Sequence, residues 1–416
     1  MQKTYPQTVN LGDLYVSAGT VVSTLMPMDN RLAAKLINDG DFYLYNHYNN
    51  DGKVTFTAGS KTGTTYMVGV SGAQNISGNA AMDWCNAIFN NKETQPAFYL
   101  SNGVRIFGSS TFQKGILDNT SYNGKLFFME DAEAVNANDD SYVNGLVQKN
   151  GKADFHFPIG AGGQYRYAGI SFLNNAENAF GGRYFFENSN LNYPHVNSQK
   201  EISLIDDREY WSVEKTKDGS GAIISLTWDE DTTPSAIYAA PLDELHIIRW
   251  DESKKIWVDE GGTADPFAKE ISTVVQASDY GIFTLARFSG TAQDSCKSIT
   301  VFNAVSPNGD NINDYLTING LADCGSENSI EIYNRWGVKV YETINYGSND
   351  NFFRGYSQGR TTISQKELLP PGTYFYVLYL KNQSGAKTKT ESGIPVLKLV
   401  AAFTISPVQK KNLIIR

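Results

Sequence analysis

The sequence has no long apolar run, few charges and only three cysteines among its 416 residues. A helix needs about 20 consecutive apolar residues to cross a bilayer, and because no stretch approaches that length, the sequence predicts no transmembrane helix. Charged residues make up only 19%, and the acidic excess gives a net charge of −9. A nucleic-acid partner is therefore not expected, since phosphate binding needs a cationic face.

The histidines are not placed as zinc proteases or serine hydrolases require. None of them lies in an HExxH or near a GxSxG, and the sequence has no Walker loop and no GxGxxG after a strand. The four histidines lie on different predicted strands or loops, with no partner at catalytic spacing: His47, His156, His195 and His246. Adjacent carboxylates are interpreted as solvated turns, namely Asp139-Asp140, Asp206-Asp207, Asp229-Glu230-Asp231 and Asp259-Glu260. The sequence thus predicts a protein that is not an enzyme.

Glycine and aromatic residues are plentiful, with 37 glycines and 12% aromatics, which is typical of a β protein with many turns. Residues 1–150 are predicted to form short strands separated by Asn, Asp and Gly. The triplet Asn-Asp-Gly, a corner that tolerates positive φ, occurs at residues 38–40 and 50–52. Strands this short must stack on neighbours, as solenoid coils do. We predict a right-handed β-helix-like solenoid for residues 1–150, with a sandwich of hairpins as the alternative.

Residues 151–288 have longer predicted strands and most of the tryptophans. Trp211, Trp228, Trp250 and Trp257 lie there on alternating strands. Large aromatic side chains in such positions usually belong to a core, and a sugar-stacking platform is the alternative. We predict a β-sandwich domain, followed by a hydrophilic linker at residues 289–298.

Three motifs follow one another near the C-terminus. SPNGDNIND occupies residues 306–314, IEIYNRWGVKVY residues 330–341, and LPPGTYFYVL residues 369–378. Gly309, Gly337 and Gly372 supply backbone freedom at chain reversals. The apolar residues between them alternate with the period of half-buried strands. The residues alone therefore predict turn, strand, strand–turn–strand, turn and strand.

These motifs resemble those of the type B C-terminal sorting domain found in gliding-motility and type IX secretion cargo proteins of Bacteroidetes. The resemblance implies an immunoglobulin-like sandwich for residues 299–416, with an atypical tail. The motif positions are Asn334, Arg335, Trp336, Gly337, Val340, Tyr341, Pro371, Gly372, Thr373 and Tyr374.

The resemblance also implies export by the type IX translocon, dependence on a PorP/SprF-like outer-membrane barrel, and placement at the outer-membrane cell surface. Our first hypothesis is a secreted structural or adhesive protein, with surface glycans or other adhesins as further partners. The second is a glycan-binding module or a polysaccharide-active enzyme on the same secretion tag. Because no leader is visible, we expect Met1 to be a start codon added to a mature chain. The alternative is a segment cut from a longer adhesin.

The glycine turn of the first motif holds candidate calcium ligands, since this ion takes oxygen side chains. They are Asn308, Asp310, Asn311, Asn313 and Asp314. An Asx turn held by its own hydrogen bonds is the alternative, and no other cofactor is expected. Cys296 and Cys324 bracket the motif and are expected to form a disulfide in an oxidising compartment, with two free thiols as the alternative. Cys85 is expected to pack as a small apolar residue.

The sequence departs from the family after Gly393. The family ends with a strand like GYxYLxR, whereas here IPVLK occupies residues 394–398. Pro395 would remove a hydrogen-bond donor from a final strand. We therefore expect the tail to lie loose, and its removal to change thermal stability little.

Overall fold

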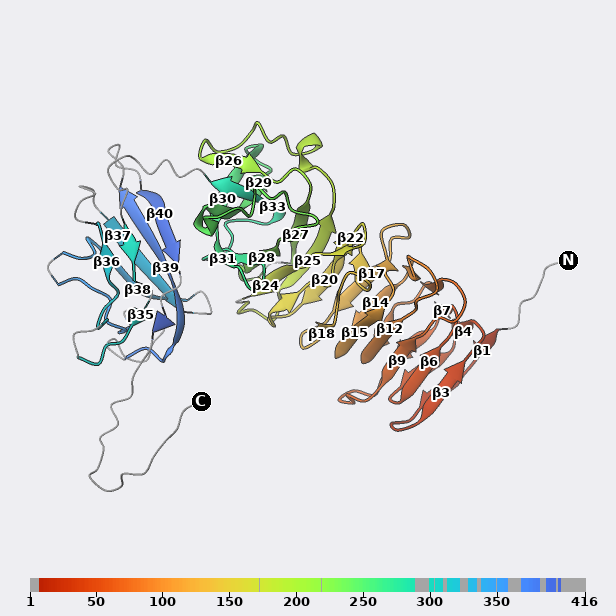
Figure 1. The fold of residues 1–416 in the computed structure, drawn as a ribbon. Coiled ribbons are helices and arrows are strands. Elements are labelled where there is room, and N and C mark those ends of the chain that lie inside the picture. The colour runs from red at the N-terminus through yellow and green to blue at the C-terminus, as the bar shows by residue number, and fades with distance from the viewer. Residues whose placement is uncertain are drawn as a thin grey trace, which may run out of the picture. The chain divides into compact units, whose positions relative to one another are not determined.

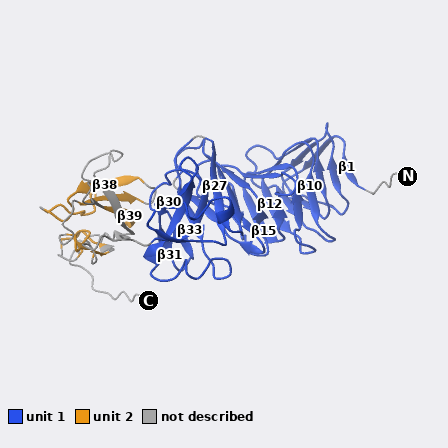
Figure 2. Cartoon of the chain, turned by 90° about the horizontal axis from the view of Figure 1, so that it is seen from above, with its two compact units in different colours: residues 1–290 blue, residues 291–416 orange. Residues whose placement is uncertain are grey.

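The computed structural model describes most of the chain as an all-β protein. It covers residues 7–171, 173–217, 219–288, 299–302, 304–309, 313–321, 328–334, 338–348, 350–357, 368–381, 387–393 and 396–397. Strands account for 49% of the structure, and the only helices in these ranges are two short 3-10 helices, η1 (Ser189–Leu191) and η2 (Leu242–Glu244). The all-β prediction is confirmed. The chain forms two compact units, residues 1–290 and 291–416 (Figure 2).

The first unit begins with a β-solenoid of about six turns (Figure 1), which confirms the solenoid predicted for residues 1–150. Its turns contribute short strands to three parallel sheets. The first sheet contains β1 (Thr8–Asn10), β4 (Met28–Asn30), β7 (Tyr48–Asn50), β10 (Gln74–Ser77), β13 (Phe98–Leu100), β16 (Leu117–Asp118) and β19 (Val143–Asn144). The second begins with β2 (Asp13–Val16), β5 (Lys35–Asn38), β8 (Lys53–Thr55), β11 (Met82–Trp84), β14 (Gly103–Ile106), β17 (Lys125–Phe128) and β20 (Val147–Asn150). The third contains β3 (Val21–Thr24), β6 (Asp41–Leu44), β9 (Thr64–Met67), β12 (Asn86–Asn90), β15 (Ser109–Lys114) and β18 (Glu133–Val135).

Side chains alternate between the inside and the outside of the solenoid, as the period of a strand requires. In β6, Phe42 and Leu44 are buried, whereas Asp41 and Tyr43 are half-buried. Parallel pairing places like residues beside each other. Tyr43 pairs with Tyr66 of β9, and their rings stack with centroids 4.0 Å apart.

Asparagine side chains connect successive turns in the interior. Asn10 Nδ2 donates to Asn30 Oδ1 at 2.8 Å, and Asn30 Nδ2 donates to Asn50 Oδ1 at 2.7 Å. Gly52 follows in an Asn-Asp-Gly triplet, and a Cβ there would lie 2.2 Å from the Arg31 carbonyl oxygen. The triplet therefore needs glycine because the preceding turn's backbone approaches closely, and not because of the positive φ that the sequence suggested.

The second solenoid sheet continues beyond the last turn, because β20 pairs antiparallel with β25. The continuation consists of β25 (Ala179–Phe185), β27 (Tyr210–Lys217), β33 (Gly281–Phe288), β29 (Leu245–Asp251) and β30 (Ile256–Gly261), with β26 (Ile202–Ile205) paired to β33. A further sheet contains β21 (Phe155–His156), β24 (Ala168–Ser171), β28 (Ile223–Thr227), β32 (Glu270–Ser272) and β31 (Thr263–Asp265). A small hairpin joins β22 (Gly160–Ala161) to β23 (Gln164–Tyr165). Both large sheets contribute to one buried core, as in a sandwich.

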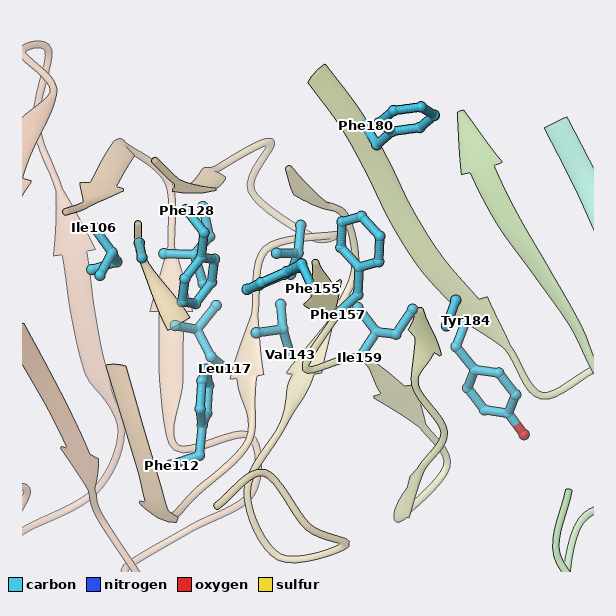
Figure 3. Close-up of a cluster of buried hydrophobic side chains, with 14 of the residues drawn as sticks. Ile106, Phe112, Leu117, Phe128, Val143, Phe155, Phe157, Ile159, Phe180 and Tyr184 are labelled. Carbon is cyan, nitrogen blue, oxygen red and sulfur yellow. The ribbon is translucent and has the colours of Figure 1, made fainter. Parts of the chain in front are cut away.

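One hydrophobic cluster runs from the solenoid into this sandwich (Figure 3). The ring of Phe128 in β17 lies 4.9 Å from that of Phe155, which lies 5.2 Å from that of Phe157. Gly182 leaves room for Phe157, since a Cβ there would lie 2.5 Å from the ring. These aromatic contacts join the interior of the solenoid to the interior of the sandwich. Residues 1–290 therefore form one unit, where the sequence suggested a division near residue 150.

The tryptophans of the first unit belong to its core. Trp211 and Trp257 are fully buried, and Trp84, Trp228 and Trp250 are at most 5% exposed. This agrees with the core interpretation of the sequence. Trp257 Nε1 donates to the Tyr193 carbonyl and Trp211 Nε1 to the Arg166 carbonyl, whereas Trp84 Nε1 is buried without a hydrogen-bond partner.

The second unit has its own core, separate from that of the first. Its strands are β34 (Thr300–Val301), β35 (Ala304–Val305), β36 (Ile318–Asn319), β37 (Asn328–Asn334), β38 (Lys339–Ile344), β39 (Gly372–Lys381), β40 (Lys387–Gly393) and β41 (Val396–Leu397). β34 pairs with β36, and the other strands form one sheet around β39 and β37. The immunoglobulin-like arrangement stays a prediction for this unit.

The chain after Gly393 was expected to lie loose, but two of its residues form a strand. Val396–Leu397 form β41, which pairs parallel with β35 and antiparallel with the first residues of β39. The short strand thus bridges two others at the edge of the sheet, instead of lying loose.

Candidate functional site

The second motif forms a β-hairpin. β37 and β38 pair antiparallel, with a bulge between Ile332 and Tyr333. Asn334 closes the end of the ladder: its N–H donates to the Val338 carbonyl at 3.0 Å, and its Oδ1 accepts from the Val338 N–H at 3.0 Å. These two bonds to Val338 close the turn of the hairpin. Three predicted motif positions in this hairpin lie outside the described residues: Arg335, Trp336 and Gly337.

The third motif lies beside the second in the folded unit. Asn334, the last residue of β37, pairs directly with Tyr374 near the start of β39. The chain therefore leaves β37 and enters β39 at the same end of the sheet. Pro371, Gly372 and Thr373 are exposed at that entrance. The structure brings together two motifs that lie about forty residues apart in the sequence.

Other motif positions are part of the core. Val340, Tyr341 and Tyr374 are each at most 5% exposed. Burial raises the pKa of the Tyr341 hydroxyl, and its ring packs against Phe353 with centroids 5.1 Å apart. Tyr374 Oη donates to the Pro370 carbonyl at 2.8 Å, fixing the chain four residues upstream. This contact is similar to the tyrosine corner of immunoglobulin-like folds.

The described part of the first motif is organised by Asp314. Its Oδ1 accepts the backbone N–H of Asn308 at 3.0 Å and of Gly309 at 2.7 Å. Asn313 has a φ of 57°, and its carbonyl accepts the Ser306 N–H. The loop is thus held by its own hydrogen bonds, with the Asp314 carboxylate reaching back five and six residues, whereas an Asx turn bonds the backbone two residues ahead. Two of the candidate calcium ligands, Asp310 and Asn311, lie outside the described residues. Among the described residues, no cluster of three or more His, Cys, Asp or Glu side chains is arranged to hold a metal.

The predicted disulfide cannot be placed, since Cys296 and Cys324 both lie outside the described ranges. Cys85 is buried and free, as expected for a small apolar residue. Its Sγ lies 3.6 Å from the Ser60 carbonyl oxygen, and burial raises the pKa of the thiol. A thiol in this state is a poor nucleophile.

Two histidines have side-chain partners that their sequence spacing did not reveal. His246 Nδ1 lies 2.8 Å from Asp259 Oδ1, across the pairing of β29 with β30. His195 Nε2 lies 2.8 Å from the hydroxyl of Ser189, and burial lowers the pKa of the imidazole. Ser189 is fully buried, so substrate has no direct access to its hydroxyl. Both contacts hold neighbouring segments of chain together.

The interpretation of all adjacent carboxylates as solvated turns is wrong for some of them. Asp206 is fully buried. Glu260 pairs with Arg249 at 2.8 Å, and both side chains are only 6% exposed. Sequence adjacency did not distinguish these from Asp140, which pairs with Lys114 at the surface.

A buried ionic network lies within the sandwich. Glu209 is fully buried and accepts hydrogen bonds from Tyr184 Oη, at 2.7 Å, and from the Thr233 hydroxyl. Arg166 approaches it at 3.9 Å and pairs with Asp229 at 3.2 Å. Burial raises the pKa of Glu209, against the lowering effect of these partners. No motif in the sequence indicates this network, because its members come from distant strands and loops.

The comparisons with known proteins identify the second unit. Residues 299–394 match the CHU_C Type IX secretion signal domain. The match includes all ten motif positions and ends just after β40. It agrees with the predicted resemblance to the type B sorting domain. No curated protein and no solved structure matches the chain. No helix in the described ranges is long and apolar enough to span a membrane.

Proposed function

We propose that this chain is a secreted structural or adhesive protein that acts at the bacterial cell surface, with residues 299–394 as its export and surface-retention signal. The match to a type IX secretion signal domain carries the proposal, since that domain indicates export of a secreted cargo. The first unit is then the exported passenger. Retention would involve a PorP/SprF-like outer-membrane barrel.

The passenger is proposed to have no enzymatic activity. Two carboxylates with little exposed side chain already serve the fold: Glu209 binds Tyr184, and Glu260 pairs with Arg249. A glycosidase instead needs two carboxyl groups facing a substrate cleft. A continuous β-core from solenoid to sandwich supports a load-bearing or displaying role.

Export is tested with a fluorescent protein fused to residues 291–416 in a Bacteroidetes host that has a type IX system. We expect the reporter outside the cell in the parent strain, and inside it when the translocon is deleted. Deleting the PorP/SprF-like barrel should move the reporter from the surface to the medium, or block its export. Equal external reporter with and without the translocon would contradict the proposal.

The contribution of the motifs is tested with matched variants in that fusion. Pro371→Ala combined with Thr373→Ala changes exposed positions at the entrance to β39, whereas Val338→Ala changes an exposed position in the second motif that is not one of the ten motif positions. We expect export to fall only in the first variant. Adhesion is tested by comparing the binding of cells to surfaces when they display the whole chain or residues 291–416 alone. Equal adhesion would contradict an adhesive passenger.

A further inference from the structure

A hollow of about 690 Å³ lies on the first unit, beside the segment that follows η1. The segment contributes Asn192, Tyr193, Pro194 and Asn197 to its lining. The opposite wall comes from the end of β29 and the turn after it. The nearby buried residues form a cluster of their own, distinct from the main core of the solenoid and sandwich. The hollow thus lies beside a hydrophobic cluster that is separate from the main core.

The segment that lines the hollow is firmly held. The Tyr193 N–H donates to the Ser189 carbonyl at 2.8 Å, and the Tyr193 carbonyl accepts from Trp257 Nε1 at 3.0 Å. Asn197 accepts the Trp257 N–H through its carbonyl at 2.8 Å. The Ser189–His195 contact closes the loop internally. A ligand would therefore meet a preformed surface and would not have to order a loose loop.

The floor of the hollow is aromatic. The ring of Tyr193 lies edge-on to those of Trp250, Trp257 and Tyr210, at centroid distances of 5.7, 6.2 and 6.0 Å. Tyr193 is half-buried and lines the hollow. Pro194 adds a second apolar ring beside it. Flat apolar rings of this kind pack against the C–H face of a sugar ring.

The rim is polar and carries compensated charge. Asn192 and Asn197 are exposed and present amide groups that both donate and accept hydrogen bonds. Glu252 accepts from Trp250 Nε1 at 2.9 Å and pairs with Lys255. Because Glu252 and Lys255 cancel, the lining itself has no net charge.

Two more carboxylates lie close to the Tyr193 hydroxyl. Glu187 accepts from Tyr210 Oη at 2.7 Å, and Glu214 accepts from the Ser212 hydroxyl at 3.0 Å. Burial, together with the charges of Glu214 and Glu187, raises the pKa of Tyr193. These negative charges disfavour an anionic ligand. They leave an uncharged, hydroxyl-rich ligand as the best fit.

We propose that this hollow binds a neutral glycan, with one pyranose ring packed on Tyr193 and its hydroxyl groups bound by Asn192, Asn197 and Glu252. The inference rests on the proposed adhesive function and names its ligand class. Each contact corresponds to a part of the sugar: the apolar face to the aromatic ring, and the hydroxyl groups to the amides and the carboxylate.

The test uses the purified full chain on a printed array of neutral and acidic oligosaccharides, followed by calorimetry with the neutral oligosaccharide that gives the strongest array signal. We expect binding to neutral glycans and none to uronic-acid or sialylated ones. Tyr193→Ala should weaken binding about tenfold or more. Tyr122→Ala removes a tyrosine that is 52% exposed elsewhere and should leave binding unchanged.

A double variant, Asn192→Ala with Asn197→Ala, guards against a folding defect in Tyr193→Ala, because both asparagines are exposed. It should also lose binding while its unfolding curve matches that of the parent. No binding to neutral glycans, a preference for acidic glycans, or full binding by the double variant would each overturn the proposal.

Displayed chains separate this inference from the function on which it rests. If cells displaying the double variant adhere as well as the parent, the glycan site is wrong and the adhesive role stands. If cells displaying the parent adhere no better than cells displaying residues 291–416 alone, the adhesive role itself fails. If only the parent adheres and a soluble neutral glycan blocks it, both are supported.

Discussion

The side-chain amide of Asn30 donates a 2.7 Å hydrogen bond to the side-chain oxygen of Asn50, one solenoid turn further along the chain. Both residues are fully buried, and Asn10 extends the row by donating to Asn30. The row is directional, since each Nδ2 points toward the following turn. The side-chain oxygens of Asn30 and Asn50 are buried away from water, and each accepts a hydrogen bond from the asparagine one turn before it. These bonds therefore stabilise the stacking of successive turns.

Replacing Asn30 with Ala should destabilise the first unit by roughly 2–3 kcal/mol, because the bond to Asn50 is lost and the Asn10 amide loses an acceptor. Chemical denaturation followed by circular dichroism measures the change. Asn75→Ala is the matched control, since Asn75 also lies in a strand of the first solenoid sheet but is exposed. A loss of equal size in both variants would show that the row contributes little.

Asp206 should make the first unit less stable as the pH rises. Burial and the neighbouring charge of Glu209 raise the pKa of Asp206. The folded chain therefore holds this proton more tightly than the unfolded chain, whose Asp ionises near pH ~3.9. The stabilisation is complete below that pH and is lost as the pH rises through the folded pKa.

Asp206→Asn removes this titration while keeping an acceptor for the Arg208 and Glu209 N–H groups. We expect the variant to exceed the parent in unfolding free energy at pH 7.5 by roughly 1–3 kcal/mol, and to approach it at pH 4.5. Asp207→Asn, at the exposed neighbouring position, is the control. A constant difference between Asp206→Asn and the parent across this range would contradict the argument.

Lys149 should have the opposite effect at higher pH. It is 1% exposed, and its Nζ donates to three backbone carbonyls, those of Met129, Glu130 and Ala132. Burial lowers its pKa to about 8, whereas an unfolded lysine titrates near ~10.4. Between these values the unfolded chain binds more protons, so stability rises with pH.

The gain expected from Lys149 between pH 7 and pH 9.5 is about 2 kcal/mol of unfolding free energy, measured by urea denaturation as the difference between the parent and Lys149→Met, because the Asp206 contribution is common to both. Lys149→Met should abolish the rise while lowering stability at pH 7, since the three carbonyls lose their donor. Lys152→Met, at an exposed position three residues further on, should keep it. A difference in stability between the parent and Lys149→Met that stays constant over this range would refute the role of Lys149.

The sequence was informative where structure repeats locally. The Asn-Asp-Gly corners around Gly40 and Gly52 predicted short stacked strands, and the solenoid followed from them. The terminal motifs predicted the secretion domain because they combine turn glycines with strand periodicity. In both cases the signal lies within a few neighbouring residues.

Contacts between distant strands left no such signal. Arg166 meets Glu209 only because β-strands and loops far apart in the chain share one core. His246 meets Asp259 through the register of β29 and β30, which contains a bulge, and a one-residue slip would change which side chains face each other. The union of solenoid and sandwich depends likewise on Phe157 filling the space above Gly182.

The short strand β41 gives the last prediction. Val396 pairs with both Ala304 and Thr373, so removing the chain after Gly393 exposes backbone groups of β35 and β39. We expect faster amide exchange at the start of β39 and a destabilisation of about 1 kcal/mol for the second unit.

Hydrogen–deuterium exchange by mass spectrometry on the full-length chain and on two shortened chains measures this effect. A chain ending at residue 393 lacks β41, whereas a chain ending at residue 400 keeps it. Faster exchange over Gly372–Thr373 should appear only in the shorter one, because the bonds to Val396–Leu397 are the ones removed. If both shortened chains exchange like the full-length chain, β41 adds no protection to the sheet, and the tail after Gly393 is dispensable for the fold of the secretion domain.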